Sequence, residues 1–371
     1  MRLAPRLVVA AALWMAAACG TRADILTISG SALGAEGIVL RRQVERFAAA
    51  HPGLPVEIQS TPDAADQRHQ LYVQWLNGWA PDPDILQLDV IWTPEFAAAG
   101  WIAPLDRFSP PTDDFFATAI AANRWNDRLY AMPWFVDVGV FYWRTDLVRA
   151  PPATFDDLVT ASLREKADGR VKDGFVWQGA RYEGLVTVFL EHLVGFGGRV
   201  LDDEGRVVVD SPAAVRALSF MRRSIDELKI VPTSVLAWQE EQSRFAFQNG
   251  QVLFMRNWPY AAALIRDDPR SPAAGHFALA AMPHDGGRSA SVLGGAQLAI
   301  NARSRQPDEA WELVRYLTSP EQMVERARVA GQFPSRPSVY DGSQLRDALP
   351  MAPAEAQALI EQAVLRPTTP V

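Results

Sequence analysis

Short apolar runs alternate with amphipathic stretches along the first ninety residues of the chain. The stretch 36–50 has helical spacing, with Leu40, Val44 and Phe47 on one side and arginine and glutamate side chains on the other. By the same criteria we expect a strand at 25–28, a helix at 36–50, a strand at 56–58, a helix at 66–79 and a strand at 83–88. Strands that alternate with crossover helices predict a parallel sheet covered on both faces, and hence an α/β fold.

Ligands of such sheets bind beyond the carboxyl ends of the strands. In this chain those ends are the segments 29–37, 60–66 and 89–92. The last of them begins with Asp89 and ends with Trp92, which places an acid and an aromatic side chain at the predicted site.

The rest of the chain continues the alternation without a tandem repeat or a low-complexity linker. Residues 130–142 form a long β-prone run that one carboxylate, Asp137, interrupts. We further expect a strand at 207–209 and helices that begin at Thr154, at Ser211-Pro212 and at Ser319-Pro320, the first and last with capping boxes completed by Asp157 and Gln322.

Composition limits the size class and the kind of partner. The chain has 371 residues, of which 49% are hydrophobic and 21% are charged. This length exceeds what one core usually fills, so we expect two lobes, and the lack of a linker indicates that the chain passes between them more than once. Thirty-six basic and 43 acidic residues give a net charge of −7, which argues against nucleic acid as a partner.

The N-terminus has the pattern of an export signal. Arg2 and Arg6 precede an apolar run at 7–18, which is shorter than the roughly 20 residues that a bilayer span needs. Cys19, the single cysteine, follows three alanines and resembles the lipid-modified cysteine of a lipoprotein, while cleavage after residues 21–23 is the alternative. We therefore expect a signal at 1–23, no disulfide, and a mature protein in the periplasm or at the cell surface. In the lipoprotein interpretation, the lipid on Cys19 would anchor the protein to a membrane.

Motifs for catalysis and for cofactors are absent from the sequence. The five histidines are scattered, and there is no H-E-x-x-H motif, no G-x-S-x-G elbow, no P-loop and no dinucleotide fingerprint. We expect no catalytic residue, no metal and no cofactor. An exported glycoside hydrolase or lyase stays open as an alternative, because that chemistry needs only two suitably spaced carboxylates, for which Asp89, Asp137 and Glu183 are candidates.

Aromatic residues stand beside polar residues in several predicted loops. The groups are Asp89 with Trp92, Trp134 with Asp137, Trp177-Gln178 with Arg181-Tyr182-Glu183, and Asn257-Trp258-Pro259-Tyr260. Aromatic rings can cover the apolar faces of a sugar, and carboxylates accept strong hydrogen bonds from its hydroxyls. The pattern favours carbohydrate binding, and Trp177 is one candidate contact.

Longer motifs extend over nearly the whole chain in order. They lie at 83–92, 132–147, 176–185, 254–260, 293–295 and 333–336, and the most distinctive are Val176-Trp177-Gln178-Gly179 and Asn257-Trp258-Pro259-Tyr260. This set resembles the extracellular solute-binding proteins (family 1) of sugar ABC transporters, most closely the trehalose/maltose-binding proteins. The resemblance implies a two-lobed periplasmic binding protein fold of type II, with a ligand cleft between the lobes.

The resemblance also implies how the lobes divide the chain. It places 24–136 and 294–318 in the N-terminal lobe, and 137–293 and 319–371 in the C-terminal lobe. Three crossings between the lobes are expected near 135–139, near 293–295 and shortly after 311–317.

The resemblance implies a function and a set of contacts. Sugar contacts are expected at Glu36, Thr61, Arg68, Asp89, Asp137, Trp258, Tyr260, Gly294 and Arg336. The expected protein is a monomer that captures a disaccharide such as trehalose or maltose and delivers it to the membrane permease of an ABC importer, whose ATPase is a separate subunit. One departure is Ala296, where related binders often carry an aromatic residue; its small side chain opens that corner of the cleft.

Overall fold

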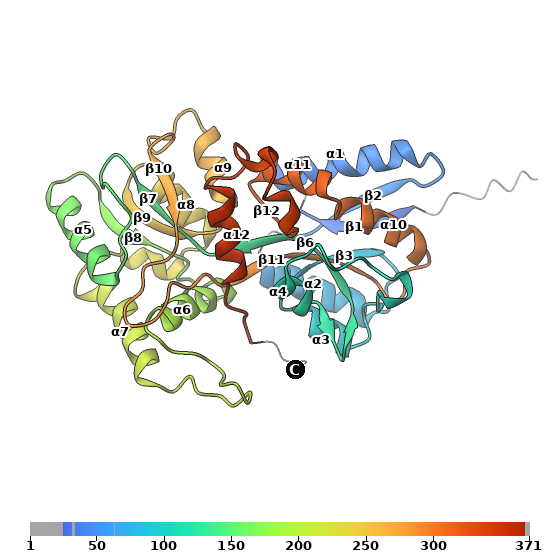
Figure 1. Ribbon diagram of the computed structural model, residues 1–371, viewed down its shortest axis with the longest axis horizontal. Helices are drawn as coiled ribbons and strands as arrows, with labels where there is room; N and C mark the ends of the chain where they lie inside the picture. Colours follow the sequence, from blue (N-terminus) through green and yellow to red (C-terminus); the bar gives the residue numbers. More distant parts are fainter. Residues whose placement is uncertain (1–24, 32–33, 63, 368–371) are drawn as a thin grey trace, which may run out of the picture.

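Two β-sheets, one in each lobe, organise the computed structural model, which describes residues 25–31, 34–62 and 64–367 (Figure 1). The first lobe has a six-stranded sheet in the order β12-β6-β11-β3-β1-β2. Its strands are β1 (Leu26–Gly30), β2 (Val56–Ser60), β3 (Ile85–Asp89), β6 (Ala131–Val138), β11 (Leu293–Ile300) and β12 (Phe333–Pro334). β1 runs parallel to β2 and β3, as the alternation predicted, whereas β11 is antiparallel to both β3 and β6, so the sheet is mixed.

Helices and short elements pack around this sheet. They are α1 (Gly34–Ala50), α2 (Ala65–Asn77), α3 (Thr93–Ala98), α4 (Ala117–Ala121), α10 (Pro307–Leu317), α11 (Pro320–Ala330), the hairpin β4 (Arg124–Trp125) and β5 (Arg128–Leu129), and the 3₁₀ turns Asp106–Phe108, Pro337–Val339 and Ser343–Leu345. The apolar face of α1 is buried as predicted, with Leu40, Val44 and Phe47 each less than 5% exposed.

The second lobe is built on a four-stranded sheet in the order β10-β7-β9-β8. Its elements are β7 (Val140–Arg144), β8 (Asp173–Val176), β9 (Val252–Asn257), β10 (Phe277–Ala280), α5 (Phe155–Ala167), α6 (Glu183–Gly195), α7 (Pro212–Asp226), α8 (Glu240–Gln248), α9 (Tyr260–Asp267) and the 3₁₀ turn Thr233–Ala237. The predicted capping box of Thr154 and Asp157 opens α5, and Pro212 is the first residue of α7.

Two predictions about local structure are wrong. Residues 207–209 form no strand of either sheet: Val207 makes an isolated bridge with Leu201, the Val208 N–H donates to the Val200 carbonyl over 2.8 Å, and Val207 is 73% exposed. Ser319 precedes α11 as expected, but its hydroxyl makes no capping hydrogen bond.

Two adjacent crossing segments, residues 138–140 and 291–293, carry the chain between the lobes. Gly139 separates β6 of the first sheet from β7 of the second, and Val292 leads into β11. The Gly139 N–H donates to the Val292 carbonyl over 3.3 Å, so the two segments lie side by side. They are close to two of the three predicted crossing positions.

Residues 319–334 lie with the first lobe, whereas the predicted division assigns 319–371 to the C-terminal lobe. α11 packs on α1, where the Gln43 amide donates to the Gln322 carbonyl over 2.9 Å and Arg46 pairs with Glu325. β12 then joins the six-stranded sheet beside β6. These polar contacts and strand pairing keep this part of the chain with the first lobe.

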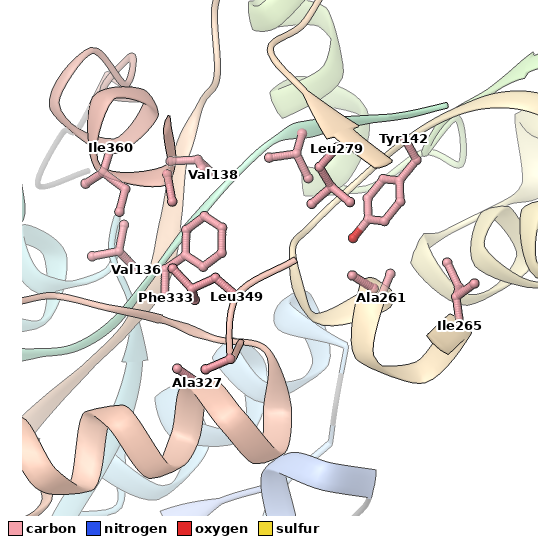
Figure 2. Close-up of a cluster of buried hydrophobic side chains, with 14 of the residues drawn as sticks. Val136, Val138, Tyr142, Ala261, Ile265, Leu279, Ala327, Phe333, Leu349 and Ile360 are labelled. Atoms are coloured by element: carbon pink, nitrogen blue, oxygen red, sulfur yellow. The ribbon is translucent and has the colours of Figure 1, made fainter. Parts of the chain in front are cut away.

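A cluster of buried side chains joins the lobes (Figure 2). It extends from Val138 and Phe333 on the first sheet to Tyr142 and Leu279 on the second. Ile360 of the last helix, α12 (Pro353–Glu361), belongs to the same cluster.

Among the described residues, no helix combines the length and the apolar composition that a membrane span requires. The predicted signal at 1–23, with Cys19, lies outside those residues.

Candidate functional site

A cavity of about 590 Å³ lies between the lobes and is lined by side chains from both. Seven of the ten predicted contacts line it: Glu36, Arg68, Asp89, Asp137, Trp258, Tyr260 and Gly294. The first three belong to α1, α2 and the end of β3, and Trp258 and Tyr260 follow β9. Asp89 therefore occupies the carboxyl end of a parallel strand, the place where ligands of α/β sheets bind.

The other three predicted contacts do not line the cavity. Trp177 is 2% exposed and belongs to the core of the second lobe. Arg336 donates to the Thr318 carbonyl over 2.9 Å, pairs with Asp114 at 3.2 Å and covers the ring of Phe115, so partners in the first lobe satisfy its charge. Thr61 is buried after β2, and its N–H donates to the carbonyl of Gly30.

Asp137 lines the cavity near the end of β6. It lies opposite Gly294 in the pairing of β6 with β11. Its Oδ1 is buried and accepts no hydrogen bond from any residue that the structure describes. Burial raises the pKa of this carboxyl to about 7; the charges of Glu36 and Asp89 add to the rise, and Arg326 and Arg256 oppose it. An acid held in this way is poised to accept hydrogen bonds from a ligand.

Glu36 is positioned by buried polar groups behind it. The Gln87 amide donates to its Oε1 over 2.9 Å, and the Arg326 guanidinium lies 3.7 Å from the same oxygen. Arg326 is 1% exposed and covers the ring of Trp134 at 3.8 Å. Sequence reasoning missed Arg326, because an arginine in the middle of an amphipathic helix has the pattern of a solvent-exposed residue.

Arg366 joins acids from the two lobes. Its Nη2 lies 2.8 Å from Oδ1 of Asp89 at the end of β3, and its Nη1 contacts Glu183 at the start of α6. Val364, two residues earlier, is held against the second crossing segment, since the Leu293 N–H donates to its carbonyl over 2.9 Å. Burial raises the pKa of Glu183 to about 6 although Arg366 opposes the rise. Sequence reasoning missed Arg366 as well.

The aromatic side of the cavity is formed by Trp258 and Tyr260. A Cβ at Gly294 would lie only 3.1 Å from the Trp258 ring, so the glycine lets the indole approach β11 closely. The indole N–H points to Oε1 of Glu240 at 3.4 Å, and the Tyr260 hydroxyl donates to Oε1 of Glu241 over 2.8 Å. Each ring is thus held by an acid of α8.

The arrangement suits a polyhydroxylated ligand. Aromatic faces can cover its C–H surface, while the carboxylates and arginines of the lining can exchange hydrogen bonds with its hydroxyls. No group of three or more histidine, cysteine or acidic side chains is placed to hold a metal within the part of the chain that the structure describes.

Comparisons with known proteins show the family and the fold. A family model described as bacterial extracellular solute-binding protein matches residues 33–324. A probable ABC transporter-binding protein of Deinococcus radiodurans is 36% identical over 334 residues, which cover 86% of this chain and 78% of that protein.

Two solved structures share the fold over almost the whole chain. MalE3 of T. maritima, solved with maltose bound, is 41% identical, with a TM-score of 0.88 over 93% of this chain and 90% of that one. The GacH receptor of Streptomyces glaucescens, solved unliganded and with acarbose, is 25% identical, with a TM-score of 0.81 over 92% and 87% of the two chains. The predicted two-lobed periplasmic binding protein fold is confirmed.

Proposed function

Because the chain belongs to the family of bacterial extracellular solute-binding proteins, we propose that it is the sugar-binding component of an ABC importer. The observation that supports this most is the cavity between the lobes, which is lined by the acids Asp89 and Asp137 and by the aromatic side chains of Trp258 and Tyr260. A ligand that contacts both lobes favours the closed arrangement by as much as its affinities for the closed and open forms differ.

The proposed ligand is a disaccharide of the α-glucoside class, such as maltose or trehalose. In support, MalE3 of T. maritima, the 41% identical structure, has maltose bound. The proposal further includes delivery to a membrane permease driven by a separate ATPase subunit, action as a monomer outside the cytoplasm, and attachment to a membrane through Cys19.

The direct test is calorimetry with purified protein against a panel of mono-, di- and trisaccharides, followed by product analysis after long incubation. We expect saturable binding of maltose or trehalose and no product above a control without protein. Absence of binding across the panel would overturn the sugar assignment, and accumulation of products would support the hydrolase or lyase alternative instead.

Sugar binding near neutral pH should release protons from Asp137. Its pKa is about 7 in the free protein, and hydroxyl donors stabilise the ionised carboxylate, so the pKa falls when a sugar binds. Affinity should consequently rise with pH between the bound and the free pKa. Calorimetry at about pH 6.5 in two buffers with different protonation enthalpies measures the release. Asp137→Asn should remove it, and proton uptake by the unmodified protein would contradict this account.

The side chain at position 296 should set the size of the ligand. Ala296 lines the cavity on β11, opposite Asp89 of β3 and Phe135 of β6. Ala296→Trp would fill this corner, so we expect tighter binding of small disaccharides and loss of trisaccharides and branched ligands by roughly tenfold or more. Titration with the same panel measures the change, and Ala296→Ser is the control. An unchanged panel for Ala296→Trp would show that residue 296 does not limit the ligand.

A further inference from the structure

A buried ion pair lies between the aromatic wall of the cavity and the two crossing segments. Arg256 on β9 is fully buried, and Glu191 on α6 is 1% exposed. The guanidinium donates from Nε to Oε2 of Glu191 over 2.7 Å and from Nη2 to Oε1 over 2.6 Å, a two-pronged contact that fixes both side chains in one plane. Gln178 accepts a third hydrogen bond from Nη1 at 3.1 Å.

On one side, this pair supports the ligand-facing indole. The guanidinium carbon of Arg256 lies 4.0 Å from the centre of the Trp258 ring. A cation over an indole face is attracted to it, and more strongly when both are removed from water. A sugar stacked on the Trp258 ring would therefore rest on an aromatic plane whose position Arg256 holds.

On the other side, the pair touches both crossing segments. Oε1 of Glu191 accepts the N–H of Val292 at 3.2 Å. A Cβ at Gly139 would overlap the Glu191 carboxylate and come within 2.5 Å of the Arg256 guanidinium, so the pair fits against the first crossing segment only because residue 139 has no side chain. A change in the backbone angles of either crossing segment would therefore displace the side chains of Glu191 and Arg256.

We propose that the Glu191–Arg256 pair links the stacking of a sugar on Trp258 to the orientation of the crossing segments, with Arg256 as a positioning residue for ligand binding. The inference rests on the proposed function, because it needs a sugar in the cavity. Well-packed apolar residues can often replace a buried ion pair without loss of stability, so stability alone does not explain this pair. Its contacts run without a gap from the ligand-binding wall to the segments that join the lobes.

The test replaces both partners at once, as Glu191→Leu with Arg256→Met, because removing one partner would leave an uncompensated buried charge. The matched control is Arg144→Met with Asp146→Leu. This control pair lies where β7 ends, away from the crossing segments; Nε of Arg144 is 2.7 Å from Oδ1 of Asp146, and neither residue lines the cavity. Melting temperatures establish that both variants are folded.

Three measurements then decide the proposal. Without sugar, hydrogen exchange at the Val292 amide should be faster in the Glu191/Arg256 variant. With a sugar that the unmodified protein binds, affinity should fall at least tenfold, and the decrease in radius of gyration on binding, measured by X-ray scattering, should shrink. The control variant should match the unmodified protein in all three.

A folded Glu191/Arg256 variant that binds sugar and compacts like the unmodified protein would overturn the inference and leave the proposed function intact. Failure of the unmodified protein to bind any sugar is a different result, and it would overturn the proposed function. If the double variant does not fold, Arg256→Lys is measured in the same way and judged by the same outcomes, because lysine keeps the positive charge beside Glu191 but cannot make the two-pronged contact.

Discussion

Replacement of Asp137 by alanine should abolish detectable sugar binding, or weaken it by a factor on the order of 100, while unfolding stays cooperative. Asp137 lines the cavity opposite Gly294, and its Oδ1 has no hydrogen-bond donor among the described residues. Its carboxylate therefore has hydrogen-bonding capacity left for a ligand. Calorimetry with the preferred sugar measures the loss. If Asp137→Ala binds sugar as tightly as the unmodified protein, the centre of the proposed site is wrong.

The ionised Asp137 carboxylate should lower the stability of the unliganded protein. A residue with a structural role would raise that stability, so the sign of the effect distinguishes a ligand-binding role from a structural one. An aspartate with a pKa of about 7 in the folded chain and about 3.9 when unfolded binds its proton more tightly in the folded state. Its unfavourable contribution is absent below about pH 4, grows as pH rises and is complete above pH 7. Asp137→Asn should thus gain roughly 2–4 kcal/mol in the free energy of unfolding at about pH 8 and almost nothing at about pH 4. Denaturant titrations at the two pH values measure the difference.

Trp258→Ala should cost more affinity than Arg68→Ala. Covering one face of a pyranose with an indole buries apolar surface on both partners, worth roughly 1–3 kcal/mol. Arg68 already donates to the Pro62 carbonyl over 3.2 Å and lies half-buried on α2, so its loss should cost only about 1 kcal/mol. Since a tenfold change corresponds to about 1.4 kcal/mol, titration resolves the two variants.

Trp79→Ala is the matched control for the loss of a tryptophan. Its side chain is 63% exposed, outside the cavity lining, and is covered on one side by Arg303. Affinity should be unchanged in this variant. Equal losses for Trp258→Ala and Trp79→Ala, or a larger loss for Arg68→Ala, would show that the indole at 258 is not the stacking surface.

The local architecture could be predicted from the sequence where one periodicity dominates. The apolar face of α1 and the strands at 26–30 and 85–89 follow directly from the spacing of apolar residues, and the start of α5 follows from Thr154 and its capping partner. The strand expected at 207–209 fails because a run of three valines specifies no partner strand. The lobe to which α11 belongs could not be predicted from periodicity, because its packing on α1 depends on contacts between residues far apart in the sequence.

The site could be predicted in part, and the reason differs between residues. Asp89 and Asp137 are conspicuous because a carboxylate at a strand end or inside an apolar run needs an explanation. Arg366 gives no such signal, because a single arginine near prolines and threonines has the composition of a surface segment. The pairing of Val364 with Val292, and the contacts of Arg366 with Asp89 and Glu183, bring it to the cavity. Trp177 was misplaced because an aromatic side chain in a short motif fits a core as well as a binding wall.

The position of β11 has a consequence for the order in which the protein can fold. β11 fills the gap between β3 and β6, although all four strands of the second sheet lie between β6 and β11 in the sequence. As a growing chain emerges, the facing edges of β3 and β6 stay unpaired until residue 300 is available, and unpaired edges are prone to aggregation. The second lobe has all its strands within 140–280 and can form its sheet first. The sheet of the lobe that begins the chain is therefore the last to be completed. The residues of β11 that line the binding cavity, 294–296, take their places in that late step.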